Sequence, residues 1–136
     1  GTLTVCGERV DLRTILAPVF VYGSYEDHIV PWTSAFACGQ ILSGPCTFVL
    51  GASGHIAGVI NPPALKKRAY WRHVSDECVD PDKWLAKAQK ISGSWWPEWD
   101  QWLVQYAGEG VANEWNADDY PIIEPAPGRY VKERIG

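Results

Sequence analysis

The sequence contains no methionine, so it has no native start residue, and we expect it to be a fragment of a longer polypeptide. It also lacks any apolar run close to the ~18 residues that cross a membrane. No charged-then-apolar signal peptide opens the chain. The sequence therefore predicts no membrane span and a cytoplasmic location.

Excess positive charge is absent as well. Twelve Lys and Arg residues stand against 16 Asp and Glu, for a net charge of −4, and no basic stripe is visible. Nucleic-acid binding relies on clustered positive charge, so we expect no nucleic-acid partner.

The four cysteines form no recognisable framework. Cys6, Cys38, Cys46 and Cys78 are widely spaced and fit neither a CxxC metal pattern nor a dense set of disulfides. We expect all four to be reduced thiols, with Cys38 and Cys46 buried as small hydrophobic residues, and no metal site.

What the sequence does contain is one strand–helix–strand unit. Residues 18–23 and 46–51 are short, mostly apolar runs, rich in β-branched and aromatic side chains and ending in glycine. Such continuous runs are typical of strands covered on both faces, as in a parallel sheet. Residues 32–42 between them can form a helix that starts after Pro31. The unit predicts an α/β fold with parallel strands joined by a crossover helix.

An acid and an imidazole follow these two strands. Asp27 lies just past the first strand, and His55 lies just past the second. Reacting groups in open α/β sheets gather outside the carboxyl ends of the strands. In the α/β-hydrolase fold the chain order is nucleophile, acid, histidine, so Asp27 and His55 are candidates for the last two members of a triad. The alternative is a turn-forming aspartate and a solvated histidine.

The rest of the chain predicts supporting elements. Residues 2–10 resemble a hairpin, and residues 82–91 and 95–106 have helical spacing. Residues 66–68 (KKR) form a basic cluster, either a solvated turn or a contact to an anionic group. The eight tryptophans either pack these C-terminal helices onto the sheet or face a cleft or a partner. We divide the chain into residues 1–112, part of a catalytic domain, and residues 113–136, an extended tail.

Four strings together resemble class I polyhydroxyalkanoate synthases, bacterial polymerases with an α/β-hydrolase core. They are EDHIVPW (26–32), GASGHIAGVINPP (51–63), GSWWPEW (93–99) and EPAPGRYV (124–131). The resemblance implies that the chain is the C-terminal part of that fold, with Asp27 as triad acid and His55 as general base. We expect His28, beside Asp27, to be a hydrogen-bonding residue of the loop rather than a reacting group.

The resemblance also implies a cysteine nucleophile within Gly-x-Cys-x-Gly-Gly. No cysteine of this sequence has those flanking glycines, so we expect the nucleophile upstream and the fragment alone to be inactive. The implied substrates are a 3-hydroxyacyl-CoA thioester and a growing polyester, with no cofactor. The intact enzyme is implied to be a homodimer at the granule surface. Two alternatives stay open: an esterase or depolymerase with a serine nucleophile, and a non-catalytic, Trp-rich interaction module.

Overall fold

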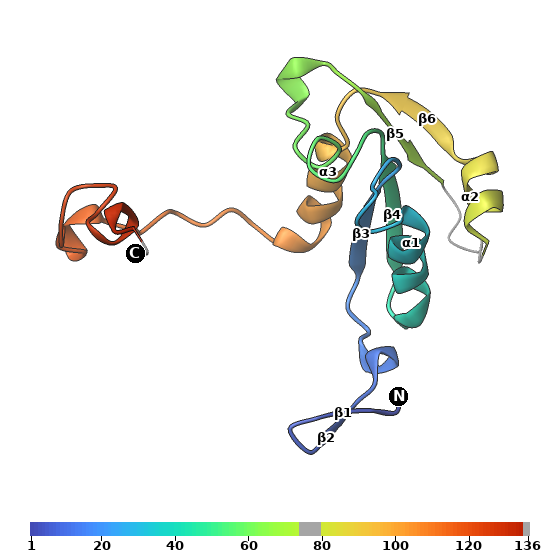
Figure 1. Ribbon diagram of the computed structural model, residues 1–136, viewed down its shortest axis with the longest axis horizontal. Helices are drawn as coiled ribbons and strands as arrows, with labels where there is room; N and C mark the ends of the chain where they lie inside the picture. The colour runs from blue at the N-terminus through green and yellow to red at the C-terminus, as the bar shows by residue number, and fades with distance from the viewer. Residues whose placement is uncertain (74–79, 135–136) are drawn as a thin grey trace.

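The computed structural model describes residues 1–73 and 80–134, which build one mixed sheet with helices on both faces (Figure 1). The sheet order is β3-β4-β5-β6, and a separate hairpin, β1-β2, precedes it. The strands are β1 (Leu3–Val5), β2 (Glu8–Val10), β3 (Val19–Ser24), β4 (Cys46–Gly51), β5 (Ala69–Arg72) and β6 (Gln89–Ser92). The helices are α1 (Trp32–Ile41), α2 (Pro81–Lys87) and α3 (Trp96–Ala107), with 3₁₀ turns at Leu12–Thr14, Pro63–Leu65, Ala117–Asp119 and Tyr130–Lys132.

The predicted strand–helix–strand unit is confirmed. Strands β3 and β4 pair in parallel, with Val19 opposite Cys46 and Ser24 opposite Gly51, and α1 crosses between them. Both carboxyl ends therefore lie at one edge of the sheet, where the loops of Asp27 and His55 begin.

Alternate residues of β4 supply both faces of the core. Phe48 and Leu50 pack with Phe36 of α1 and Trp84 of α2, whereas Val49 packs on the opposite face with Tyr70 and Trp95. Because side chains alternate along a strand, a strand covered on both faces is apolar throughout. Val49 and Leu50 are accordingly fully buried.

The helix predicted over residues 82–91 is wrong in its second half. Helix α2 ends at Lys87, and residues 89–92 form β6, antiparallel to β5 with Ile91 opposite Tyr70. Trp84 and Ile91 share a helical spacing, yet they pack against opposite faces of the sheet. Ladder hydrogen bonds to β5 outweigh the local helical pattern. Because β5 is antiparallel to β4 and β6 is antiparallel to β5, the sheet is mixed rather than purely parallel.

Helix α3 covers the second face of the sheet and carries much of the tryptophan-rich segment. Trp95, at its N-terminus, stacks on Tyr22 and Phe20 of β3, and Trp102 packs edge-on against Phe20. Packing of the aromatic residues onto the sheet, one of the two predicted alternatives, is therefore realised on this face.

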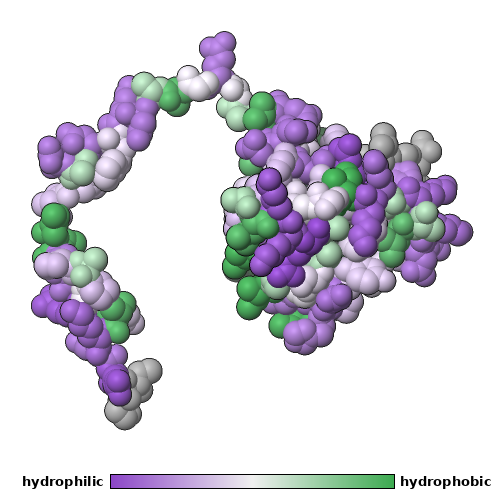
Figure 2. All heavy atoms as spheres, turned by 90° about the horizontal axis from the view of Figure 1, so that it is seen from above, coloured by the Kyte–Doolittle hydropathy of each residue, from purple (hydrophilic) through white to green (hydrophobic). Residues whose placement is uncertain are grey.

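The two ends of the chain lie outside this layered body. The N-terminal hairpin forms as predicted, and the segment after α3 runs away from the sheet as a separate arm (Figures 1 and 2). None of the helices within residues 1–73 and 80–134 is both long and apolar enough to span a bilayer.

Cys6, Cys38 and Cys46 form no disulfide in the described part of the chain. Cys38 is exposed rather than buried, because it lies on the face of α1 turned away from the sheet, and Cys46 is half-buried. Cys78 lies outside the described residues.

Candidate active site

The loop after β3 is tied to the loop after β4 by main-chain hydrogen bonds. The Tyr25 N–H donates to the Gly51 carbonyl (2.8 Å), and the Glu26 N–H donates to the Ser53 carbonyl (3.0 Å). Ser53 adopts a φ of +79°, a conformation uncommon for a residue with a side chain. These contacts extend the parallel pairing past the ends of the strands and hold the two loops side by side.

The Asp27 carboxylate lies at the junction of these loops. Its Oδ1 accepts hydrogen bonds from the N–H groups of Ile29 and Val30, both at 2.9 Å, and its Oδ2 lies 2.7 Å from Nδ1 of His55. The Val30 N–H above all, then the His55 ring and the Ile29 N–H, lower the pKa of Asp27 to about 2. The carboxylate is therefore ionised at neutral pH and can only accept, so His55 Nδ1 must carry the proton between them.

The imidazole of His55 lies on the accessible side of this pair. Its side chain is 42% exposed, whereas that of Asp27 is 9% exposed. With Nδ1 donating to Asp27, the other ring nitrogen, Nε2, is left as an acceptor. The arrangement can therefore take a proton from a group brought to His55 and stabilise the resulting imidazolium.

A pair of hydroxyl groups lies beneath the His55 loop. The Tyr22 hydroxyl is 3.1 Å from Oγ of Ser24, which is only 3% exposed. Burial raises the pKa of Tyr22, so its hydroxyl keeps its proton and can donate. Two glycines make room for this pair, since a Cβ at Gly51 would overlap the Tyr22 hydroxyl and one at Gly58 would lie 2.8 Å from it.

The end of the His55 loop is hydrogen-bonded to the N-terminus of α3 and to the residues just before it. The indole N–H of Trp95 donates to the Gly58 carbonyl (3.1 Å), and that of Trp96 donates to the Val59 carbonyl (2.9 Å). Asn61, which is 2% exposed, donates from Nδ2 to the carbonyls of Lys67 (3.3 Å) and Gly93 (3.4 Å). The loop that presents the histidine is thus held at its C-terminal end by side chains from distant parts of the chain.

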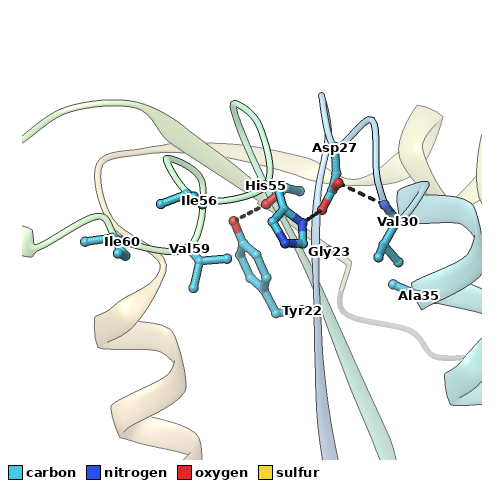
Figure 3. Close-up of a pocket in the computed structure, with 10 residues that line it drawn as sticks. Tyr22, Gly23, Asp27, Val30, Ala35, His55, Ile56, Val59 and Ile60 are labelled. Atoms are coloured by element: carbon cyan, nitrogen blue, oxygen red, sulfur yellow. Dashed lines mark hydrogen bonds and ion pairs between the residues drawn. The ribbon is translucent and has the colours of Figure 1, made fainter. Parts of the chain in front are cut away.

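A pocket of about 420 Å³ opens at this edge of the sheet (Figure 3). Asp27 and His55 supply its reactive polar groups, and its wall is otherwise largely apolar. Its lining residues are Tyr22, Gly23, Ser24, Asp27, Val30, Ala35, His55, Ile56, Val59 and Ile60. A few converging polar groups in an apolar hollow are typical of a small-molecule site.

The structure brings Asp27 and His55 together and leaves the other candidates outside the pocket. His28 is exposed and does not line the pocket. The cluster at residues 66–68 follows the 3₁₀ turn Pro63–Leu65, has positive φ at Lys66 and Arg68, and does not line the pocket.

Neither a thiol nor a metal cluster accompanies the acid–base pair in the described part of the chain. Cys6, Cys38 and Cys46 do not line the pocket. No group of three or more potential metal ligands occurs within residues 1–73 and 80–134. The pair can move protons, but the described residues offer it no thiol nucleophile.

Sequence reasoning missed the residues that support the pair. Tyr22 was assigned only to a strand, Ser24 only to the loop after it, and Trp95 and Trp96 only to a helical segment. The run of buried strand residues that includes a tyrosine and a serine just before the acid loop was a usable signal, because buried hydroxyls need partners. The two adjacent indole donors were another, but their acceptors are 37 residues away.

Known proteins similar to this chain share one description. It is 55% identical to the poly(3-hydroxyalkanoate) polymerase subunit PhaC of Cupriavidus necator over 138 aligned positions, which cover 98% of this chain and 23% of that protein. It is 39% identical to the subunit of the same name from Rhizobium meliloti, covering 98% of this chain and 22% of the relative. It is 38% identical to poly(3-hydroxyalkanoate) polymerase 2 of Ectopseudomonas oleovorans, covering 97% of this chain and 24% of the relative.

These relatives confirm the resemblance predicted from the sequence. Nearly the whole chain aligns with each, while the chain spans only about a quarter of their length. No protein-family model matches the chain. The chain is thus homologous to one segment of these polymerases.

Proposed function

We propose that this chain is the part of a poly(3-hydroxyalkanoate) polymerase that supplies the acid and the base of a Cys-His-Asp triad. The observation that carries the proposal is the 2.7 Å contact between Asp27 Oδ2 and His55 Nδ1 in a pocket, within a segment 55% identical to a polymerase of that name. Neither the contact nor the sequence identity would carry the proposal alone. Asp–His pairs occur in many enzymes, and sequence similarity by itself specifies no mechanism.

The chemistry requires a thiolate, which another part of the polypeptide must supply. An ordinary cysteine is only a few per cent thiolate at neutral pH, and a nearby imidazole raises that share. His55 Nε2 takes the thiol proton, and the sulfur attacks the thioester carbonyl of a 3-hydroxyacyl-CoA. The carbonyl carbon–sulfur bond to CoA then breaks, CoA leaves as a thiol with one proton, and the acyl group remains on the cysteine. Asp27 keeps the imidazole in the required tautomer and stabilises its cation.

Chain growth repeats the proton transfer with a hydroxyl group. The hydroxyl of another acyl unit or of the growing polyester loses its proton to His55 and attacks the acyl-cysteine thioester. A new ester bond forms, and the cysteine leaves as a thiolate that regains the proton from the imidazolium. No cofactor enters either step, and the proposed substrates are the acyl-CoA and the polyester chain.

The edge of the sheet supports placing the chain at the C-terminal end of an α/β-hydrolase fold. Among the described residues β3 pairs only with β4, so its outer edge offers unpaired main-chain groups. An unpaired edge next to a buried strand invites another strand. We propose that upstream strands of the complete enzyme pair there and carry the nucleophile.

The competing interpretations gain less support. A hydrolase with a serine nucleophile could use the same Asp27–His55 pair, but the relatives are named polymerases. An interaction module would expose most of its tryptophans, whereas Trp84 and Trp95 are buried in the core and, among the described residues, only Trp99 and Trp115 are exposed. The homodimer and the granule surface stay predictions.

The test uses Asp27→Asn and His55→Ala in the complete enzyme, assayed by CoA release and polymer formation from 3-hydroxybutyryl-CoA. We expect each variant to lose about 10² to 10⁴ of the rate, the usual contribution of a positioned base. His28→Ala is the matched control, since this neighbour is exposed and outside the pocket, and we expect it to retain near wild-type activity. Wild-type rates in Asp27→Asn or His55→Ala would refute the assignment.

A further inference from the structure

We propose that Trp95 and Trp96 are positioning residues that hold the His55 loop through their indole N–H groups. The inference rests on the proposed function, because it assigns a role in catalysis to residues that do not themselves touch the substrate. It adds to the Asp27–His55 pair the residues that hold the main chain of His55 in place.

The His55 loop ends in carbonyl groups that need donors. Residues 54–60 form helical turns, in which the Gly58 N–H donates to the Gly54 carbonyl (2.8 Å) and the Ile60 N–H donates to the Ile56 carbonyl (2.9 Å). The last carbonyls of any such turn lack partners further along it. Here the two consecutive carbonyls of Gly58 and Val59 accept from two consecutive indoles, at 3.1 and 2.9 Å.

Trp95 also contacts the strand that leads to the acid. Its ring stacks on Tyr22 of β3 with the centroids 4.4 Å apart, and Trp95 as a whole is only 9% exposed. Tyr22 lies five residues before Asp27 and lines the same pocket. The Trp95 ring therefore contacts both β3, which leads to Asp27, and the loop that carries His55, so a shift of this ring would change the distance between the two side chains.

The segment that carries the two tryptophans is itself held by hydrogen bonds. Ser94 is 9% exposed, and its Oγ accepts a hydrogen bond from the main-chain N–H of Trp96 at 3.1 Å. The Gly93 N–H donates to the Arg68 carbonyl (2.9 Å), and the Gly93 carbonyl accepts from Asn61 (3.4 Å). Because these bonds connect back to the end of the His55 loop, the segment and the loop form one closed set of contacts.

The consequence for catalysis is geometric. A proton transfer needs the base within hydrogen-bonding reach of the reacting group, and small misplacements remote from the chemistry reduce turnover. Asp27 fixes the imidazole from one side only. The indole N–H groups fix the main chain that carries the ring, and the backbone position of His55 depends on them.

The test replaces each donor while keeping an aromatic ring. Trp95→Phe and Trp96→Phe remove the N–H, and Trp102→Phe is the matched control on α3, whose ring contacts Phe20 and Tyr106 rather than the His55 loop. In the complete enzyme we expect kcat to fall about fivefold to tenfold in the first two variants, the scale of one lost hydrogen bond. KM for 3-hydroxybutyryl-CoA is expected to stay within twofold, and the control to match wild type.

A second measurement does not depend on activity. The proton shared between His55 Nδ1 and Asp27 should give a low-field resonance in the proton NMR spectrum, identified by its loss in His55→Ala. We expect Trp96→Phe, which removes a donor from a half-buried side chain, to shift or broaden that resonance while Trp102→Phe leaves it unchanged. Should Trp95→Phe fail to fold, Trp96→Phe still carries both measurements.

The outcomes separate the two proposals. An intact enzyme without activity on 3-hydroxyacyl-CoA would end the proposed function, while the resonance would still report on the loop. Unchanged kcat and an unchanged resonance in the folded Trp96→Phe variant would overturn the positioning role. A loss of kcat equal to that of Trp102→Phe would also overturn it, because the effect would then be general packing.

Discussion

Replacing Gly58 by alanine should disturb the active site through a single methyl group. A Cβ at this position would lie 2.5 Å from Ser24 Oγ, 2.8 Å from the Tyr22 hydroxyl and 2.9 Å from the Ala52 carbonyl oxygen. A carbon atom does not come this close to a non-bonded oxygen, so one of these groups would have to move. Gly58 therefore allows the His55 loop to lie directly on the hydroxyl pair.

The magnitude follows from how little these neighbours can move. Ser24 is 3% exposed, and the Ala52 oxygen belongs to the main chain, so neither can swing away as a flexible side chain would. Overpacking of this kind typically costs about 1–3 kcal/mol. Since the Gly58 carbonyl also accepts from Trp95, we expect part of that cost to appear as a displaced His55 loop.

Gly54→Ala is the matched control, four residues earlier in the same loop. A Cβ there would meet only the Glu26 carbonyl oxygen, at 3.5 Å, an ordinary contact, and Gly54 is not among the glycines with positive φ. At such a site alanine is neutral or stabilises by about 0.4–1 kcal/mol, because it restricts the unfolded chain.

The assay compares urea unfolding, followed by tryptophan fluorescence, with the rate of CoA release for both variants in the complete enzyme. We expect Gly58→Ala to lose both stability and activity and Gly54→Ala to lose neither. Equal stability and activity in Gly58→Ala and the wild type would refute the close packing of the loop on Tyr22 and Ser24.

Two further predictions concern pH and the core. Because the pKa of Asp27 is lowered to about 2, its stabilising contribution is complete above the unfolded value of about 4 and disappears as the pH falls toward 2. The difference in unfolding free energy between wild type and Asp27→Asn should therefore shrink on acidification below about pH 4, and a difference that grew would contradict the assignment. Leu50→Ala, at a fully buried position, should lower the free energy of unfolding in urea by about 3–5 kcal/mol. Val104→Ala, on the exposed face of α3, should lower it by less than about 0.5 kcal/mol. Equal losses in the two variants would contradict the placement of Leu50 in the core.

Sequence patterns were sufficient for the centre of the fold. The apolar runs now seen as β3 and β4 each form a strand, because β-branched and aromatic side chains covered on both faces favour that state. A crossover between such strands makes them parallel, which sends the loops of Asp27 and His55 to one edge. Chain order and residue type were thus enough to name the pair.

The pattern failed where partners distant in the chain decide the conformation. Ile91 has a helical spacing from Trp84, but residues 89–92 pair with β5, and Ile91 packs on the opposite face of the sheet from Trp84. A periodicity records only which residues share a face within one element. It contains nothing about a neighbouring strand that offers a row of free hydrogen-bonding groups.

The sequence by itself determined the strand–helix–strand unit, the order of Asp27 and His55 after its two strands, and the similarity to the polymerases, because each depends on residues close together or on strings read in order. Only the tertiary structure decided that Trp95 and Trp96 hold the His55 loop and that Tyr22 and Ser24 lie beneath it. Hydrogen bonds between residues 37 positions apart leave no local trace in a sequence, since nothing in either partner alone specifies the other.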